Sequence, residues 1–463
     1  MTYDDIEDDD ILKEEEKQAL EYEPLRFVWQ DKTLQQNTRA VLVAVTKATS
    51  EKEMVQEHLE ELKLLADTQG IPIVGELMLS IRAINAATFI TEGKVEQLQK
   101  YVEANNANLV IFDDDISPAQ QRNLERLLAM PVIDRTEVIL GVFAMRARSR
   151  EARLQVKLAE VRYLIPRLKR MWTHLSRQSG GGGGAGGGGY QKGEGEQQLE
   201  IDKRILRRRM ERLQKEIIAI GEYRETQRMQ RLRSNIPVIA IVGYTNAGKS
   251  TLMNTLTKAD VYVEDKLFAT LDTTTRKHVL PNNHEVLFID TVGFIRKLPH
   301  QLVAAFRSTM EEAVHADLIL HVIDATHPMA MEQAETTIKV LEELDSQNTP
   351  ILVVLNKVDR LEGEDATPEQ RAQLLKLKLK FAGAKCISAA TGLGVPELEA
   401  ELVLRLQERR TLLHLRIPQS EYHILAAAIR EGKIYKQEYE ENDVLVELEV
   451  PKSASFRFEK YAI

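Results

Sequence analysis

A short glycine-containing loop between an apolar run and a helix-like segment limits most strongly how this chain can fold. The apolar run covers residues 236–242, and the loop that follows reads Gly243, Tyr244, Thr245, Asn246, Ala247, Gly248, Lys249, Ser250 and then Thr251. In such a loop the backbone N–H groups surround a β-phosphate, the lysine contacts β- and γ-oxygens, and the serine hydroxyl can bind Mg²⁺. The pattern predicts a strand, a phosphate-binding loop and a helix. Taken alone, the pattern also fits an ordinary glycine-rich turn, so the segments that follow are needed to choose between a turn and a phosphate-binding loop.

A second apolar run, residues 286–289, ends in Asp290, Thr291, Val292 and Gly293. An Asp at a strand end can reach Mg²⁺ through water, and the glycine N–H can bind a γ-phosphate. The expected metal-binding residues are Ser250, Asp290 and one threonine of the segment discussed below. Lys249 and Gly293 are the expected catalytic groups on the phosphates.

A third apolar run, residues 351–355, ends in Asn356, Lys357, Val358 and Asp359. One carboxylate can accept hydrogen bonds from guanine N1–H and the exocyclic amine, a donor pair that adenine lacks, so Asp359 is expected to select GTP over ATP. Small residues at Ser388, Ala389 and Ala390 would let the backbone approach the base. Four such loops, each following a strand, match the nucleotide crevice of a doubly wound sheet and predict a GTP-binding domain.

Between the first two loops lies a polar segment with the position of a switch loop. Its expected nucleotide-contacting residues are Phe268, Ala269, Thr270, Leu271 and Asp272. One threonine should complete the Mg²⁺ shell when the γ-phosphate is present and leave it after hydrolysis. Thr270 is the favoured catalytic and metal-binding residue, and Thr274 is the second choice.

Phe294 stands where many signalling GTPases have the glutamine that orients the attacking water. A phenyl ring cannot do this. The orienting group must come from elsewhere, either from Arg296, Lys297 or His300 or from a macromolecular partner. The sequence therefore predicts slow intrinsic hydrolysis that a partner accelerates.

Length and charge pattern divide the rest of the chain. With 463 residues, about three domains are expected. Residues 1–34 read as an acidic, disordered tail and residues 35–140 as a small α/β domain. The GTPase domain would span 235–409 and a small α+β domain 410–463. Asp113, Asp114 and Asp115 end a strand-like run, where a solvated terminus is favoured over a metal site.

Residues 141–234 read as a basic helical hairpin with a glycine-rich tip at 180–189. Apolar residues at helical spacing should pack the two helices together, which leaves the basic side chains outward. These are Arg146, Arg148, Arg150, Arg153, Lys157, Arg162, Arg167, Lys169, Arg170, Arg177, Lys203, Arg204, Arg207, Arg208, Arg209, Arg212 and Lys215. In a chain of net charge -9, this concentration indicates a surface for a polyanion, and nucleic acid is favoured over a merely solvated charged face.

The single cysteine, Cys386, falls in a segment expected to be a buried strand, so no intramolecular disulfide is possible. No N-terminal apolar segment and no apolar run of about 18 residues is visible, which argues against secretion and a transmembrane segment. We expect a cytoplasmic protein, with peripheral membrane association left open. Nothing in the sequence requires more than a monomer.

Taken in order, these segments resemble the HflX family of translation-associated GTPases, in the Obg–HflX group. The marks are residues 267–272 and 290–295, the run 117–125 from Ser117 to Glu125, the triplet Asp134-Arg135-Thr136, residues 152–159, and Pro166-Arg167-Leu168. Two departures are residues 193–200, where the family usually has G-x-G-E-T-Q-L-E, and Thr273, where it usually has proline.

The resemblance implies binding of GTP and GDP with Mg²⁺, and association with the large ribosomal subunit and its RNA. It also implies splitting or rescue of stalled or inactive ribosomes under stress. Some members are reported to use ATP through the N-terminal domain, but the only glycine-lysine pattern there, Gly93-Lys94, reads as a helix start. The alternatives are a GTP-gated adaptor whose hairpin binds a protein or an anionic membrane, and an ATP-dependent RNA remodeller.

Overall fold

The computed structural model of the chain describes residues 37–48, 51–168, 192–233, 236–258, 267–268, 271, 273–297, 315–344, 349–363, 366–407, 410–440, 442–451 and 455–463. The acidic tail, the glycine-rich tip, Ala269, Thr270, Asp272 and His300 lie outside these residues. The chain forms two compact units. Unit 1 contains Met1–Ile218 with Lys266–Leu271 and Lys297–Phe306, and unit 2 contains the remainder, so their boundary falls inside one long helix.

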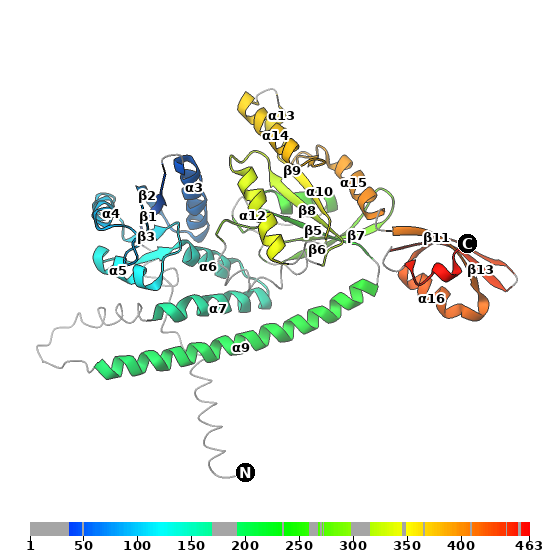
Figure 1. Cartoon of the computed structure of the whole chain (residues 1–463), viewed down its shortest axis with the longest axis horizontal. Coiled ribbons are helices and arrows are strands. Elements are labelled where there is room, and N and C mark those ends of the chain that lie inside the picture. Colours follow the sequence, from blue (N-terminus) through cyan, green and yellow to red (C-terminus); the bar gives the residue numbers. More distant parts are fainter. Residues whose placement is uncertain are drawn as a thin grey trace, which may run out of the picture. The chain divides into compact units, whose positions relative to one another are not determined.

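The N-terminal part of unit 1 is a four-stranded parallel sheet in the order β2-β1-β3-β4, covered by helices on both faces (Figure 1). Apolar side chains of α4 and α5 pack on one face, and α3 and α6 contact each other and the sheet. Strands and helices alternate along the chain, as expected for a small α/β domain in residues 35–140. The elements are β1 Ala40–Thr46, α3 Lys52–Gln69, β2 Ile73–Ser80, α4 Glu92–Ala104, β3 Leu109–Phe112, α5 Pro118–Leu128, β4 Val132–Asp134 and α6 Arg135–Arg146.

A helical hairpin follows, formed by α7 Arg150–Leu164, η3 Ile165–Arg167 and the 42-residue α9 Lys192–Arg233. The expected first arm is not one continuous helix, because α6 ends at Arg146 and α7 begins at Arg150, after Ser149, whose side chain accepts a hydrogen bond from the Ala152 N–H. Within unit 1, α7 lies along α9 (Figure 1). The shared core contains Leu158, Val161, Leu168, Leu206 and Leu213. The predicted packing of the two helices is therefore correct.

The prediction that every basic side chain of the hairpin points outward is wrong for Arg167, which is 8% exposed. Its guanidinium lies 3.7 Å from the centre of the Tyr163 ring and donates to Asp134 Oδ2 at 3.0 Å. It also donates to Gln121 Oε1 and to the Ile116 carbonyl. Lys169, Arg170 and Arg177 lie outside the described residues.

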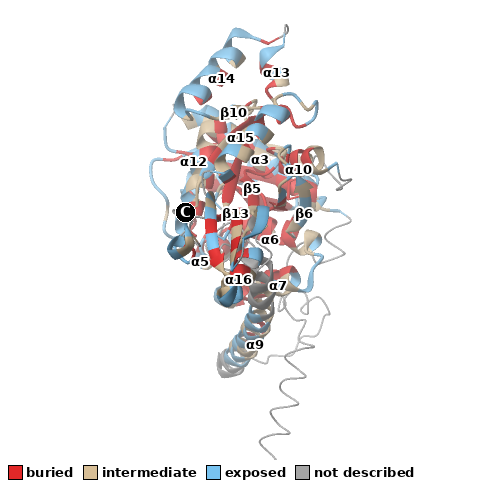
Figure 2. Cartoon of the chain, turned by 90° about the vertical axis from the view of Figure 1, so that its right-hand side faces the viewer, coloured by how far each residue is buried: buried red, intermediate tan, exposed pale blue. Residues whose placement is uncertain are grey.

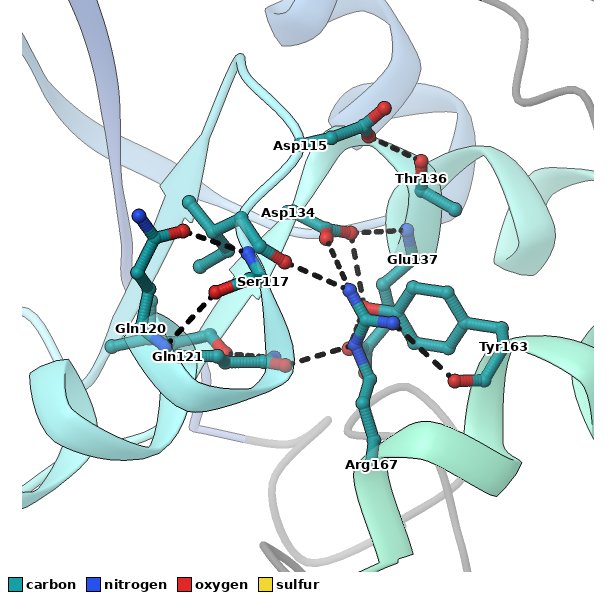
Figure 3. A network of polar contacts seen from close by, with 11 residues as sticks. Asp115, Ser117, Gln120, Gln121, Asp134, Thr136, Glu137, Tyr163 and Arg167 are labelled. Carbon is teal, nitrogen blue, oxygen red and sulfur yellow. Dashed lines mark hydrogen bonds and ion pairs between the residues drawn. The ribbon is translucent and has the colours of Figure 1, made fainter. Parts of the chain in front are cut away.

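This network joins segments far apart in the sequence (Figure 3). Asp134 is fully buried, accepts hydrogen bonds from the Glu137 N–H and the Tyr163 hydroxyl, and forms the ion pair with Arg167. Burial raises the pKa of Asp134, and Arg167 opposes that shift. Three of the family-like sequence marks, at 117–125, 134–136 and 166–168, thus contribute residues to one buried cluster that ties the hairpin to the sheet.

Asp113 also departs from its prediction. It is 3% exposed rather than solvated, because Arg135 Nη1 donates to its Oδ1 at 2.9 Å. Arg135 is fully buried and pairs with Glu61 as well, and Asp115 accepts a hydrogen bond from Thr136. The aspartates at this strand end are held by internal partners. Among the described residues, no group of three or more His, Cys, Asp or Glu side chains could hold a metal ion.

Unit 2 is built on a six-stranded sheet in the order β10-β9-β8-β5-β7-β6, parallel except for β6. The central strands are almost wholly buried, as the red around β5 in Figure 2 shows. Helices α10 and α15 pack on one face, and α12 and α14 on the other. The elements are β5 Val238–Gly243, α10 Lys249–Thr257, β6 Thr274–Val279, β7 Glu285–Asp290, β8 Leu318–Asp324, α12 Ala330–Glu343, β9 Ile351–Asn356, α13 Asp359–Glu362, α14 Pro368–Lys380, β10 Lys385–Cys386 and α15 Val395–Gln407.

The C-terminal part of unit 2 is a three-stranded antiparallel sheet in the order β11-β13-β12 with α16 against one face. This is the α+β arrangement expected for the C-terminal part of the chain. The elements are β11 Arg410–Pro418, η4 Gln419–Glu421, α16 Tyr422–Glu431, β12 Lys433–Glu440, β13 Asp443–Pro451 and η5 Glu459–Tyr461. Cys386 in β10 is partly exposed, not buried as expected. Within the described residues, no helix is long and apolar enough to cross a membrane.

Candidate nucleotide-binding site

The loop between β5 and α10 has the geometry expected of a phosphate-binding loop. Lys249 Nζ donates to the carbonyl oxygens of Gly243 and Tyr244 at 3.1 and 2.8 Å, which curls the loop around the ammonium. Gly248 adopts φ +91°, and a Cβ there would lie 2.3 Å from Asn356 Nδ2. The N-terminus of α10 and the loop N–H groups suit an anion.

Lys249 is 6% exposed. Burial lowers the pKa of Lys249 to about 8, and the nearby Asp290 carboxylate opposes this shift. The loop therefore holds a cation that burial disfavours. The phosphates of a nucleotide would supply the negative charge that offsets this cost.

The two oxygen groups expected to serve Mg²⁺ lie together. Ser250 Oγ donates to Asp290 Oδ2 at 2.6 Å, and Asp290 is fully buried at the end of β7. Hydroxyl and carboxylate oxygens are the ligands that Mg²⁺ prefers, so this pair fits the ion. Thr274 is the first residue of β6, opposite Asp290, so it stands in a strand rather than in the switch loop.

The segment after Asp290 runs beside the phosphate-binding loop as an extension of the sheet. The Thr245 N–H donates to the Phe294 carbonyl at 2.8 Å, and the Phe294 N–H donates to the Gly243 carbonyl. The Arg296 N–H donates to the Tyr244 hydroxyl at 2.7 Å. Phe294 is 2% exposed, so its ring is part of the core and does not face a water molecule.

Asn356 links the expected base-binding segments to the phosphate-binding loop. Its Nδ2 donates to the Ala247 carbonyl, and its Oδ1 accepts from the Ala389 N–H, both at 2.9 Å. Asp359 begins α13 directly after this strand end. Ser388 and Ala389 are buried, whereas Ala390 is exposed. The structure thus brings Asn356, Lys357, Val358, Asp359, Ser388, Ala389 and Ala390 to one edge of the sheet.

Sequence reasoning missed Asp324, at the end of β8. Its Oδ2 pairs with Lys357 Nζ at 2.7 Å, and its Oδ1 accepts from the Thr326 N–H and hydroxyl. Asp324 therefore holds the Lys357 ammonium in place beside the expected base-binding residues. The signal was available, because Asp324 follows an apolar run just as Asp290 does. Thr255 was also missed, and its hydroxyl donates to the Ala389 carbonyl at 2.6 Å.

Phe268, of the expected switch segment, and Lys297, a candidate for orienting water, both belong to unit 1. The Phe268 ring packs edge-on against Phe143, with 4.5 Å between the ring centres. Lys297 Nζ forms ion pairs with Asp114 and, at 3.8 Å, with Asp113. Lys297, one of the candidates for orienting water, is therefore engaged by two carboxylates.

Comparisons with known proteins agree with this architecture. Three family models match in succession, described as GTP-binding GTPase N-terminal at 56–144, GTP-binding GTPase Middle Region at 146–231 and 50S ribosome-binding GTPase at 238–357. The fold and the ordered loops define a P-loop GTPase, which binds GTP and GDP and hydrolyses GTP.

The relatives give the particular family. The chain is 44% identical to the GTPase HflX of Chlamydia pneumoniae over 428 residues, covering 92% of this chain and 89% of the relative. It is 41% identical to the GTPase HflX of Escherichia coli (strain K12) over 412 residues, covering 89% and 93%. The chain belongs to the HflX family of GTPases.

A solved structure of a GTP-binding protein from the archaeon Sulfolobus solfataricus in complex with GDP is also similar. It is 24% identical, covers 80% of this chain and 99% of that chain, and has a TM-score of 0.39.

Proposed function

We propose that this GTPase binds the large ribosomal subunit through the basic hairpin, and that it splits or rescues stalled or inactive ribosomes under stress. The observation that carries the proposal is the charge on α9. Arg204, Arg207, Arg212 and Lys215 are exposed there, while the apolar side of the helix packs on α7. A row of exposed cations on a long helix suits the phosphates of RNA. The description of the model matched at 238–357 supports a ribosomal target.

The proposed site uses the residues that the structure groups at the ends of β5, β7, β9 and β10. Residues 243–251 hold the phosphates, Ser250 and Asp290 with Thr270 hold Mg²⁺, and Asp359 reads guanine. When bound, Mg²⁺ would neutralise charge on the β- and γ-oxygens. Phe268, Ala269, Leu271 and Asp272 would accompany Thr270 when the switch closes.

Hydrolysis by the chain alone is proposed to be slow, because the buried Phe294 ring leaves no polar side chain at the position of the usual glutamine. The ribosome would then accelerate the reaction, and GDP formation would release the protein. We place the protein in the cytoplasm as a monomer that acts on ribosomes.

The test is GTP hydrolysis by the purified full chain, alone and with purified large ribosomal subunits, at low and moderate salt, with Lys249→Ala as the blank. Stimulation that falls as salt rises is the expected result. Absence of both stimulation and subunit binding would overturn the ribosomal assignment and favour the adaptor with a protein or membrane partner. ATP turnover that survives Lys249→Ala would favour the RNA remodeller.

A further inference from the structure

We propose that the Thr245 hydroxyl is the chain's own group for orienting the attacking water in GTP hydrolysis. The inference deepens the proposed function, since it rests on the γ-phosphate lying against Lys249 and Gly293. It adds a catalytic role to a residue that the sequence pattern marks only as part of the phosphate-binding loop.

The first observation is the state of the hydroxyl. Thr245 is 7% exposed, yet its Oγ1 has no hydrogen-bond partner within the described part of the chain. A buried hydroxyl without a partner is unfavourable, and such a group in a native protein calls for a ligand, an ion or a water molecule that it serves. The Thr245 N–H is already used by the Phe294 carbonyl. Of the Thr245 hydroxyl and the Thr245 N–H, only the hydroxyl is therefore available to bind a ligand.

The second observation is the location of the side chain. A Cβ built on Gly293 would lie 2.8 Å from Thr245 Cγ2, 2.9 Å from Thr245 Cα and 3.0 Å from Lys249 Nζ. Thr245 thus lies against Gly293, on the side where Lys249 Nζ also approaches. The methyl Cγ2 faces Gly293, and a rotation of χ1 to the neighbouring rotamer would bring Oγ1 to that place.

The other candidates are less well placed. Phe294 carries no polar side-chain atom and is in the core. Lys297 Nζ is held by Asp113 and Asp114. Of Thr245, Phe294 and Lys297, Thr245 combines a buried hydroxyl without a hydrogen-bond partner with a position against Gly293.

A hydroxyl can accept one hydrogen bond and donate another. Thr245 Oγ1 would accept a hydrogen bond from the attacking water and donate one to a γ-phosphoryl oxygen. The water oxygen then bonds to the γ-phosphorus as the bond from phosphorus to the β–γ bridging oxygen breaks. GDP keeps the electron pair of that bond, and the water proton leaves on the released phosphate. The threonine is unchanged.

The test compares Thr245→Val, which keeps the shape and removes the hydroxyl, with Thr245→Ser, which keeps the hydroxyl. Thr257→Val is the matched control, because the Thr257 hydroxyl donates to the Met253 carbonyl within α10. Single-turnover GTP hydrolysis is measured without ribosomes. Fluorescent GDP is titrated with and without aluminium fluoride, which mimics the transferring phosphoryl group, and subunit binding is measured separately.

We expect Thr245→Val to lower the hydrolysis rate by about 10- to 100-fold and to weaken the aluminium fluoride complex by a similar factor. Affinity for GTP and GDP should stay within about threefold, and Thr245→Ser and Thr257→Val should resemble the parent protein. An unchanged rate in Thr245→Val, or an equal loss of GDP affinity, would overturn the inference. Thr245→Val should bind the large ribosomal subunit as the parent protein does. If it does, a failure of the inference about Thr245 leaves the proposed ribosomal function unaffected.

Discussion

At the scale of single residues, Lys249 links the site to pH. Burial holds the pKa of Lys249 at about 8, whereas a lysine in water titrates near its ordinary value of 10.5. Bound phosphates would raise this pKa again, because they favour the charged form. Nucleotide binding above pH 8 would therefore take up a proton, and below pH 8 it would not.

The first prediction follows from that linkage. Affinity for GDP should be nearly constant from about pH 6.5 to 7.5 and should fall above pH 8, by at most about tenfold per unit, because only the free protein loses the Lys249 proton. A titration of fluorescent GDP at each pH checks this. Lys249→Ala, with its weaker binding, should show no such slope, and an equal slope in that variant would contradict the assignment to Lys249.

The second prediction concerns Asp324. Asp324→Asn keeps the oxygen that accepts from Thr326 but removes the charge that holds Lys357. Affinity for GTP should fall by about three- to tenfold, since a partly buried charged pair contributes roughly 1 kcal/mol. The matched control is Glu362→Gln, which breaks the exposed pair of Lys378 with Glu362 at 2.8 Å. Equal effects of the two substitutions on affinity would reject a special role for Asp324.

At the scale of elements, the cluster around Arg167 explains how the hairpin is fixed to the sheet of unit 1. One guanidinium contacts the end of α7, the β4 carboxylate of Asp134, and Gln121 on α5 (Figure 3). The helix packing of α7 on α9 then extends from this anchor. The hairpin is held by a buried ion pair at the C-terminal end of its first arm and along its length by apolar contacts.

The third prediction is that Arg167→Met destabilises unit 1 by roughly 3–5 kcal/mol, because it leaves the Asp134 carboxylate buried without its cation. Without Arg167 the pKa of Asp134 rises further, so the loss should shrink as pH falls and the carboxyl becomes neutral. Hydrogen exchange of β4 and α7 peptides measures the local stability. Adding Asp134→Asn should recover part of the loss.

The control for this experiment is Arg153→Met, which removes an exposed arginine from α7, the helix that precedes η3. GDP affinity reports on unit 2 and should not change in either variant. A comparable loss of protection in Arg153→Met would mean that any arginine on α7 has this effect.

At the scale of the whole molecule, the charge is unevenly distributed. The chain has a net charge of -9, yet α9 presents Arg204, Arg207 and Arg212 to solvent. Arg209 is half-buried and lowers the pKa of Glu160, whose burial raises that pKa to about 7. The three exposed arginines are therefore better reporters of RNA contact than Arg209.

The fourth prediction uses Arg204, Arg207 and Arg212 changed together to Glu. Subunit binding should weaken, and the slope of log affinity against log salt should decrease by about 0.7–0.9 for each phosphate whose ion pairing is removed. GDP affinity should hold. The matched control reverses three exposed cations on α14, at Arg371, Lys376 and Lys380, and should leave binding almost unchanged. Unaltered subunit binding in the α9 variant would show that this face of α9 does not contact the subunit.

The sequence by itself determined the features that depend on consecutive residues. The phosphate-binding loop, the motifs after β7 and β9, and the capped start of α5 at Ser117 each need particular residues at neighbouring positions, because local backbone geometry sets their conformation. The alternation of residues 35–140 and the apolar faces of the hairpin were readable for the same reason.

Only the tertiary structure decided which distant side chains meet. Arg167 with Asp134, Arg135 with Asp113, and Asp324 with Lys357 are pairs separated by 33, 22 and 33 residues. Nothing local distinguishes a buried arginine from the exposed ones beside it, since the same basic side chain suits either place until a carboxylate is brought opposite it. Whether a basic side chain is buried, and which carboxylate it pairs with, depends on how the elements pack, because packing brings together residues that are far apart in the sequence.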